Sequence, residues 1–387
     1  MNYAIRHHHW VHLTEILDHI RTSPNFSRNN TQSLLDRAVV LWANAKRRRS
    51  DHFSSLLEWG ANPNILFEAR WEFTRDDSNT LFHSIRFPSQ IDALISHGFS
   101  KLNHLNSGGA TPIMKLAEIF DSHILHRAIG AGCVPDYQDF HGRTALHHTV
   151  EAAWERFNLN PYRTHHLQTS TFECTEVLLR GGSDPNLGDF CRCACSRIGC
   201  TPVYLLMKSA RQANDYPESQ PLAAYLWCFE WLEVILTIKG YETAKICLQA
   251  MLRLLNFEAL ELTHTCCRKK RYKTMWDTID EDEVDEIMEE EKEMIEDLDR
   301  RMDDLEQSFD VQQTLEDIWM KELPNLVKAR SKRVSTAWET ILRNPTAAQL
   351  WHWNEWSCRH PRNHCPNLWT QFGSYFLIYS WKASANI

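Results

Sequence analysis

Apolar residues in the first half of the chain recur in pairs, and each pair is followed by glycine and a short polar segment. The pattern first appears at residues 56–60 and returns before Gly98, Gly132 and Gly182. An apolar pair suits the end of a helix that packs on a neighbour, and glycine permits the left-handed conformation that ends a helix. The steps from Gly60 onward are 38, 34 and 50 residues, so the pattern predicts a series of helical units.

A phrase that begins with threonine marks the start of another helix in each unit. It is present at Thr80, Thr111, Thr144 and Thr201. Threonine can cap a helix through its hydroxyl, and the proline after Thr111 and Thr201 loses no hydrogen bond at the first helical position. In this order, the two phrases resemble the ankyrin repeat, whose unit has about 33 residues and a Thr-Pro-Leu-His-x-Ala start.

The resemblance to the ankyrin family covers about residues 34–206. It implies an all-α fold, a helical solenoid of four or five divergent repeats in which each repeat is two antiparallel helices and a projecting loop. The sequence departs from the family pattern at Met114, where the family prefers histidine, and in an insertion at about residues 154–171. Because His147 stands at the histidine position of the pattern, we interpret it as structural rather than catalytic.

The resemblance also implies a function. In ankyrin repeats generally, the concave surface of inner helices and loop tips binds protein partners. One predicted tip carries Tyr137, Phe140 and His141, which combine aromatic area with polar edges, as interface anchors often do. We expect these residues to bind a protein partner, with ordinary loop packing as the alternative.

The organisation of the rest of the chain follows from changes in composition. Apolar residues with helical spacing before residue 34 suit a capping helix, and two helical segments after residue 206 can close the far end of the stack. The predicted regions are the N-terminal capping helix (1–33), the repeats (34–206), a helical closing region (207–275), an acidic helix (276–322) and a tryptophan-rich tail (323–387).

The net charge of −8 hides a separation of charge along the chain. Residues 277–317 contain 20 acidic and 3 basic residues, a local charge of −17, so the remainder carries about +9. Apolar residues in this segment continue a heptad seam that is interrupted at Glu291, and we predict one helix of about 25–40 residues. This helix can pair with a second copy as a coiled-coil homodimer, or fold back onto the basic remainder.

The strongest chemical signal is a cluster of four thiols within ten residues, followed about 65 residues later by a second group. Together they offer more soft ligands than the four that a structural zinc needs. The cluster has three interpretations: a zinc that ties the last repeat to the closing helices, buried reduced thiols, or a redox pair. The candidate metal ligands are Cys191, Cys193, Cys195, Cys200, His264, Cys266 and Cys267.

The spacing of these cysteines is not the usual Cys-x-x-Cys. In an extended strand, alternate side chains lie about 6.5–7 Å apart, whereas tetrahedral zinc needs sulfur atoms under about 4 Å apart. A zinc-binding loop would therefore have to curl, which Ser196 and Gly199 allow. The cysteine pattern is similar to one in ankyrin-repeat proteins of filamentous fungi, which implies no particular activity.

Motifs of the common enzyme classes are missing from the sequence. It has no Gly-x-x-x-x-Gly-Lys-Ser/Thr phosphate loop and no Gly-x-Ser-x-Gly elbow. It also has no run of 18 or more apolar residues, so no membrane association is expected. Because the N-terminus lacks an apolar signal core, we expect an intracellular protein, cytoplasmic or nuclear.

Two basic clusters, residues 46–49 and 268–273, suit nuclear import or nucleic-acid binding. No aromatic reader motif accompanies them, so nucleic acid is not an expected partner. The sequence therefore predicts a non-catalytic scaffold or adaptor that binds a protein through its repeats. The alternatives are a metal-dependent regulator or enzyme that uses the cysteine cluster, and a nuclear regulator that uses the basic clusters.

Overall fold

The structure is a computed structural model of the 387-residue chain, which divides into two units, Met1–Ser331 and Lys332–Ile387. All residues that the structure describes belong to the first unit. Both basic clusters, Cys266, Cys267, the tryptophan-rich tail and most of the predicted N-terminal cap lie outside the described residues. The described residues are 15, 18–19, 22, 28–43, 50–70, 75–159, 164–212, 220–265, 281–308 and 315.

The described part of the chain is mostly helical, which confirms the predicted helical class. One element departs from the all-α prediction, because β1 (Leu66–Arg70) and β2 (Arg75–Thr80) form an antiparallel hairpin. The register of the hairpin shifts between Phe67 and Ala69. The helices up to residue 259 are α3 (Arg28–Ala43), α4 (Ser50–Glu58), the 3-10 helix η1 (Leu81–Ser84), α5 (Pro88–Ser96), α6 (Pro112–Ala117), α7 (Ser122–Gly130), α8 (Ala145–Leu159), α9 (Thr164–Arg180), α10 (Pro202–Gln212), α11 (Gln220–Lys239) and α12 (Tyr241–Ala259).

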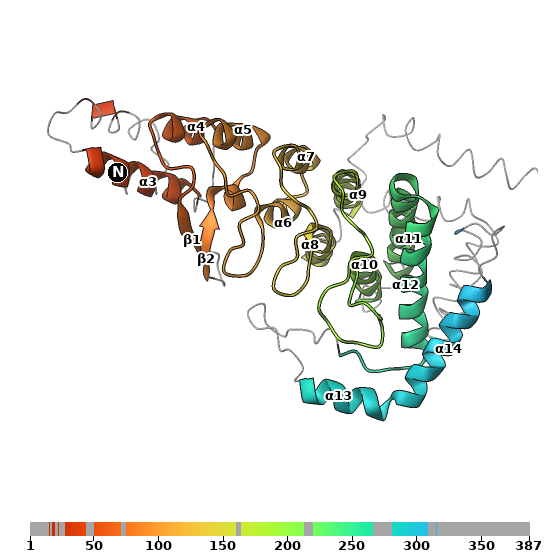
Figure 1. The fold of residues 1–387 in the computed structure, drawn as a ribbon. Helices are drawn as coiled ribbons and strands as arrows, with labels where there is room; N and C mark the ends of the chain where they lie inside the picture. Colours follow the sequence, from red (N-terminus) through yellow and green to blue (C-terminus); the bar gives the residue numbers. More distant parts are fainter. Residues whose placement is uncertain are drawn as a thin grey trace, which may run out of the picture. The chain divides into compact units, whose positions relative to one another are not determined.

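Most of these helices lie in two neighbouring rows. In one row η1 contacts α6, α6 contacts α8 and α8 contacts α10. In the other row α4 contacts α5, and the contacts continue through α7 and α9 to α11. Pairs such as α6 with α7 and α8 with α9 join the rows, and they follow one another in chain order (Figure 1). Each helix therefore packs mainly on helices that are near it in the sequence.

Glycine ends the second helix of successive pairs, as the apolar-pair pattern predicts. After α7, Gly132 has a φ of 107°, which is the left-handed region that favours glycine. The Gly132 N–H donates to the Ile129 carbonyl oxygen at 2.9 Å, and the Cys133 N–H donates to the Ala128 carbonyl oxygen at 3.1 Å. The same conformation and the same two bonds occur at Gly60, Gly98 and Gly182.

An asparagine side chain links one helix end to the next. The Asn64 amide donates to the Gly98 carbonyl oxygen at 3.0 Å. The Asn103 amide donates to the Gly132 carbonyl oxygen at 3.3 Å, and its oxygen accepts from the Val134 N–H at 2.8 Å. Because these bonds satisfy backbone groups that a helix end leaves open, they fix the step from one helix pair to its neighbour.

Two buried histidines connect the helices of the first row. His147 accepts a bond from the Thr144 N–H through Nδ1 at 3.0 Å, and its Nε2 bonds to the Cys200 carbonyl oxygen at 2.9 Å. His83 bonds in the same way to the Ala110 carbonyl oxygen at 3.1 Å. Burial lowers the pKa of His147 to about 3 and that of His83 to about 4, so both rings are neutral. These bonds confirm the structural interpretation of His147.

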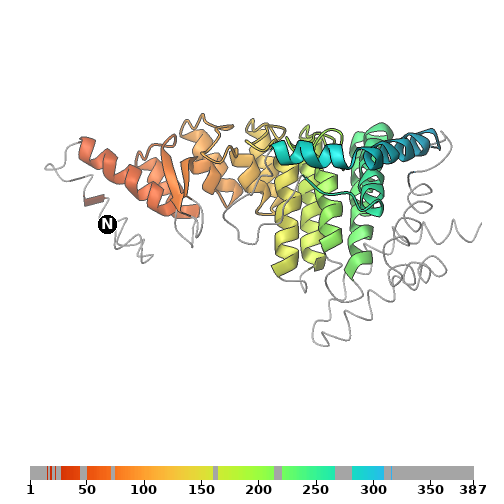
Figure 2. The ribbon, with the colours of Figure 1, turned by 90° about the horizontal axis from the view of Figure 1, so that it is seen from below.

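The residues of the predicted insertion lengthen two helices. α8 has 15 residues where α6 has 6, and α9 has 17 where α7 has 9. Figure 2 shows the yellow and yellow-green helices extending beyond their shorter neighbours. The added length therefore projects from one end of these pairs, while the glycine and histidine contacts at the other end are kept.

His148 joins two carboxylates next to the turn that starts at Asp139. Its Nδ1 lies 3.0 Å from Glu118 Oε1, and its Nε2 lies 3.1 Å from Asp139 Oδ2. Burial alone would lower the pKa of His148, but the hydrogen bonds with Asp139 and Glu118 raise it. Burial alone would raise the pKa of Glu118, but the His148 bond and the Lys115 charge lower it to about 2. Each group therefore stabilises the charged form of its neighbours.

Replacing His148 by alanine leaves two carboxylates facing each other without their cation. We expect the free energy of unfolding to fall by about 3 kcal/mol, at the low end for a buried pair, because 37% of the Glu118 side chain is exposed. Because the pKa of His148 is raised, the contribution of His148 to stability is lost as pH rises through its folded-state pKa. The lowered pKa of Glu118 means that its contribution is lost as pH falls.

The difference in the free energy of unfolding between wild type and His148→Ala is therefore largest between pH 4.5 and pH 6.5. These are the ordinary pKa values of a glutamate such as Glu118 and a histidine such as His148. Denaturant titrations across that range measure it. The control is His126→Ala, at an exposed position of α7. We expect it to leave the free energy of unfolding unchanged across this pH range. A flat pH dependence for His148→Ala would contradict the charged bridge.

Candidate functional site

Turns between helix pairs are closed by a single side-chain oxygen. Asn106 Oδ1 accepts from the Gly108 N–H at 3.0 Å and from the Ala110 N–H at 2.9 Å. Asp139 Oδ1 makes the same pair of bonds, two and four residues further along, at 2.8 and 2.9 Å. A short polar side chain that accepts from the backbone ahead of it holds a turn in one conformation.

The next turn of this kind carries the cysteine cluster as an insertion. Asp189 Oδ1 accepts from the Cys191 N–H at 3.1 Å and from the Cys200 N–H at 2.7 Å. Eleven positions separate Asp189 from Cys200, whereas four separate Asn106 from Ala110, so this turn is seven residues longer. We call residues 191–200 the cysteine loop. Its ends are fixed like those of the shorter turns, and only the residues between them depart from the pattern.

The cysteine loop curls, as the spacing of its thiols requires for a metal site. The Ser196 N–H donates to the Cys193 carbonyl oxygen at 3.1 Å, which closes a tight turn. Gly199 has a φ of 87°, and a Cβ at this position would meet the Asp189 carbonyl oxygen at 1.9 Å. Only glycine fits there, and the close backbone approach brings the loop back to its start.

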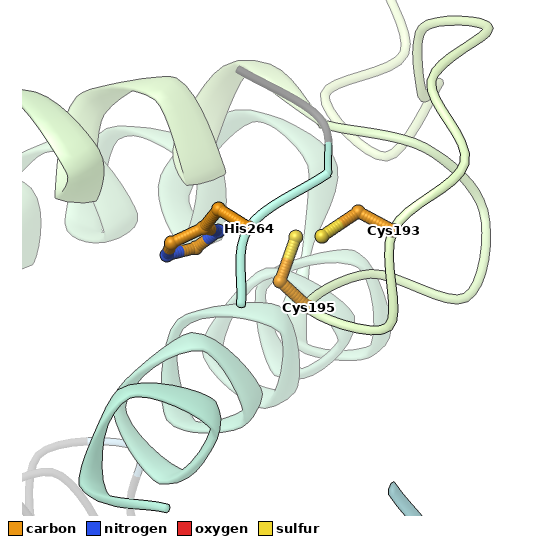
Figure 3. A group of neighbouring side chains, drawn as sticks. All are labelled: Cys193, Cys195 and His264. Atoms are coloured by element: carbon orange, nitrogen blue, oxygen red, sulfur yellow. The ribbon is translucent and has the colours of Figure 1, made fainter. Parts of the chain in front are cut away.

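The curl places Cys193 and Cys195 beside His264, which follows α12. One ligand atom of each residue lies within 4.8 Å of the other two. Figure 3 shows the two sulfur atoms pointing toward one another next to the segment that carries His264. Both cysteines are buried, and the Tyr204 hydroxyl holds His264 through Nδ1 at 3.1 Å. Two thiols and one oriented imidazole are donors that suit zinc.

Cys191 and Cys200 belong to a second group. Their sulfur atoms lie 3.2 Å apart, and an oxygen of Asp189 lies within 4.8 Å of both. The predicted ligands within the described residues therefore form two groups rather than one. Asp189, which was not among the predicted ligands, belongs to the second group. The remaining predicted ligands, Cys266 and Cys267, lie outside the described residues.

The acidic segment forms two helices, so the prediction of one long helix is wrong. α13 (Glu281–Glu290) and α14 (Lys292–Ser308) lie on either side of Glu291 (Figure 1). The Glu291 carboxylate accepts from the Thr263 N–H at 2.9 and 3.0 Å. The residue that interrupts the seam therefore anchors the bend to the segment that carries His264. The buried apolar residues of the two helices are Val284, Leu298 and Met302.

Charged side chains join α14 to the cysteine loop. Arg253 of α12 is buried; it donates through Nε to the Ala194 carbonyl oxygen at 3.0 Å and through Nη1 to Asp299 Oδ1 at 2.7 Å. Arg197 of the loop bonds to the same Asp299 oxygen at 3.0 Å. Burial alone would raise the pKa of Asp299, but the bonds from Arg253 and Arg197 lower it. The acidic segment thus folds back onto the chain here, and a homodimer through it stays a prediction.

The predicted partner-binding residues lie at the surface of the turn that Asp139 closes. Tyr137 is 44% exposed, Phe140 is 63% exposed, and His141 is exposed as well. The Phe140 ring lies over the preceding turn, where a Cβ on Gly109 would come within 2.6 Å of it. The ring is therefore supported from below while its outer face meets solvent.

Phe190 is an equivalent residue that the sequence analysis missed. It follows Asp189 as Phe140 follows Asp139, it is 63% exposed, and a Cβ on Gly142 would lie 2.6 Å from its backbone nitrogen. Its N–H donates to the His141 carbonyl oxygen at 2.9 Å, which joins the two turns. Aligning the two aspartates in the sequence would have revealed it.

Comparison of the sequence with models of known protein families and with curated proteins found no match. Among the described residues, no helix combines the length and apolar character that crossing a membrane requires.

Arg253→Met tests the attachment of α14 to the cysteine loop. The substitution removes a buried guanidinium that bonds to Ala194 and Asp299. We expect the free energy of unfolding to fall by about 2–3 kcal/mol, and not by more, because 40% of the Asp299 side chain is exposed. Hydrogen exchange of α14 amides should accelerate accordingly. The matched control is Arg192→Met, whose ion pair with Asp285 is exposed on both sides and contributes about 0.5 kcal/mol. Equal effects of the two variants would argue against the attachment.

Proposed function

We propose that this chain is a non-catalytic scaffold that binds a protein partner through the tips of ankyrin-like repeats. The observation that carries the proposal is the pair of solvent-facing rings of Phe140 and Phe190, at the same place in two successive turns. Aromatic side chains held at defined spacing supply large contact area, and they dominate the energetics of many interfaces.

The assignment of the helix pairs to ankyrin-like repeats rests on recurrence. Left-handed glycines end the second helices, asparagine side chains bond to the next glycine, and side-chain oxygens close the intervening turns. Each contact joins neighbours only, which is how stacked repeats are stabilised. The hairpin of β1 and β2 and the long α8 and α9 are departures from this pattern.

The turns prepare the two rings for binding. Phe140 and Phe190 rest on the backbone of the preceding turn, so little of their motion remains to be lost when a partner covers them. Tyr137 and His141 are exposed polar residues of the same segment of the chain as Phe140. A partner that presents an apolar centre with hydrogen-bonding groups around it fits this surface.

We further propose that Cys193, Cys195 and His264 hold a structural zinc ion. The donors are two thiols and an imidazole, the combination that zinc favours, and they leave one position of a tetrahedral site for a fourth ligand. Bound zinc would join the cysteine loop to the segment after α12. Because the two cysteines are buried, the geometry favours this structural role over the alternative of a metal-dependent enzyme. The nuclear alternative rests on clusters outside the described residues.

The double substitution Phe140→Ala/Phe190→Ala tests the scaffold proposal. Full-length chain on beads captures proteins from extract, and mass spectrometry compares the recovery between variants. We expect a partner to be recovered with wild type and reduced about ten-fold or more by the double variant, because two interface anchors are lost. Melting curves of both proteins verify that the fold is intact.

The matched control for this capture is Tyr241→Ala/Ile246→Ala on α12, which removes two apolar side chains that are 38% and 46% exposed. It should retain the partner at the level of wild type. If both double variants capture the same proteins as wild type, the partner does not bind at these turns.

Metal analysis tests the zinc proposal. Purified full-length protein should contain about one zinc per chain, and Cys193→Ser and His264→Ala should each abolish it and lower the melting temperature. The control is Cys174→Ser, at a buried thiol outside the loop, which should keep the metal. Protein that takes up no zinc from a supplemented buffer, or zinc content that Cys193→Ser does not change, would reject the site.

A further inference from the structure

The two ends of the cysteine loop carry thiols that touch. Cys191 Sγ and Cys200 Sγ lie 3.2 Å apart, at positions that correspond to the closing residues of the shorter turns. Cys200 is completely buried, whereas Cys191 is partly exposed. The zinc site proposed above uses neither of them.

The backbone on both sides of this pair is held in place. The N–H groups of Cys191 and Cys200 donate to the same oxygen of Asp189, at 3.1 and 2.7 Å. The His147 ring bonds to the Cys200 carbonyl oxygen at 2.9 Å. A disulfide needs its sulfur atoms about 2.05 Å apart, so side-chain rotation has to close a gap of about 1 Å. The anchored backbone keeps the two thiols facing each other while this happens.

We propose that Cys191 and Cys200 form a reversible disulfide that closes the cysteine loop, and that this pair is a redox modification site. The inference goes beyond the scaffold proposal and does not rest on it. Cys193 and Cys195 are poorer candidates for pairing with each other, because only one residue separates them and the small ring would be strained. Loss of the proposed zinc site would leave the Cys191–Cys200 pair in place.

The oxidant is a low-molecular-weight disulfide such as oxidised glutathione. The thiolate of the more accessible Cys191 attacks one sulfur of it, which forms a mixed disulfide and releases one thiolate. Cys200 then attacks the Cys191 sulfur, forming the intramolecular bond and releasing the second thiolate. The two protons from the cysteines pass through solvent to the two released thiolates. The protein loses two electrons, and the small disulfide gains them.

Closure of this bond would fix the loop beside two exposed apolar residues, Phe190 and Ile198. It would also constrain Arg192 and Arg197, which bond to the acidic helices. The disulfide therefore stiffens the end of the predicted binding surface without moving the turn that Asp189 closes.

The test equilibrates the full-length protein in glutathione buffers of increasing oxidation, once with zinc present and once after chelation. The sample is quenched with acid, free thiols are alkylated, and tryptic peptides are identified by mass spectrometry. Cleavage at Arg180, Arg192, Arg197 and Lys208 places Cys191, Cys200 and the Cys193–Cys195 pair on three different peptides, so the cross-linked partners are unambiguous.

We expect a cross-link between peptides 181–192 and 198–208, with the loss of two alkylatable thiols per chain and full reversal by dithiothreitol. Cys191→Ser, at the partly exposed position, should abolish it, while Cys195→Ser should retain it. Cys174 is the internal control, because burial raises its pKa to about 12 and it should stay reduced.

Three results would overturn the proposal. The first is cross-links that involve Cys193 or Cys195 in place of Cys191 and Cys200. The second is oxidation of the pair only after the protein is denatured. The third is complete protection of Cys191 and Cys200 by zinc, with Cys191→Ser losing bound metal, which would make them metal ligands. Protein that takes up no zinc from a supplemented buffer but still forms the cross-link would reject the zinc site alone.

Discussion

One side-chain oxygen that accepts two backbone N–H groups sets the geometry of successive turns. Asn106, Asp139 and Asp189 provide it, and each holds the chain as it leaves one helix pair and enters the next. Helix packing alone would leave these turns several conformations, because their backbone donors could bond to water instead. Once the turns are fixed, the phenylalanine that follows each aspartate must lie at the surface, above the backbone of the turn before it.

Much of the local structure could be predicted from the sequence, because its causes are local. A glycine after an apolar pair ends a helix wherever the pair occurs, and the chain bears this out at Gly60, Gly98, Gly132 and Gly182. The role of His147 also followed from its position after threonine. The need for a curl in the cysteine loop followed from bond lengths, since alternate residues of a strand lie too far apart for one zinc ion.

The features that were missed depend on partners far away in the sequence. Glu291 interrupts a seam, but the bend there is fixed by Thr263, which the heptad pattern does not reveal. The charge imbalance predicted that the acidic segment could fold back, yet only the structure shows that buried Arg253 binds Asp299 of this segment. The division of the thiols into two groups likewise depends on where His264 lies after α12. The hairpin of β1 and β2 is the exception, because its two strands are neighbours in the sequence and were missed all the same.

The cysteine loop has a consequence for how such a chain can change over time. Its seven extra residues begin and end at the positions where the shorter turns close, so the helices on either side are not displaced. The stretch can therefore change in length without altering the spacing of the helix pairs, provided that Ala194 and Arg197 keep their bonds to Arg253 and Asp299. A protein engineer can use the same freedom, by grafting a foreign peptide between the two N–H groups that Asp189 binds.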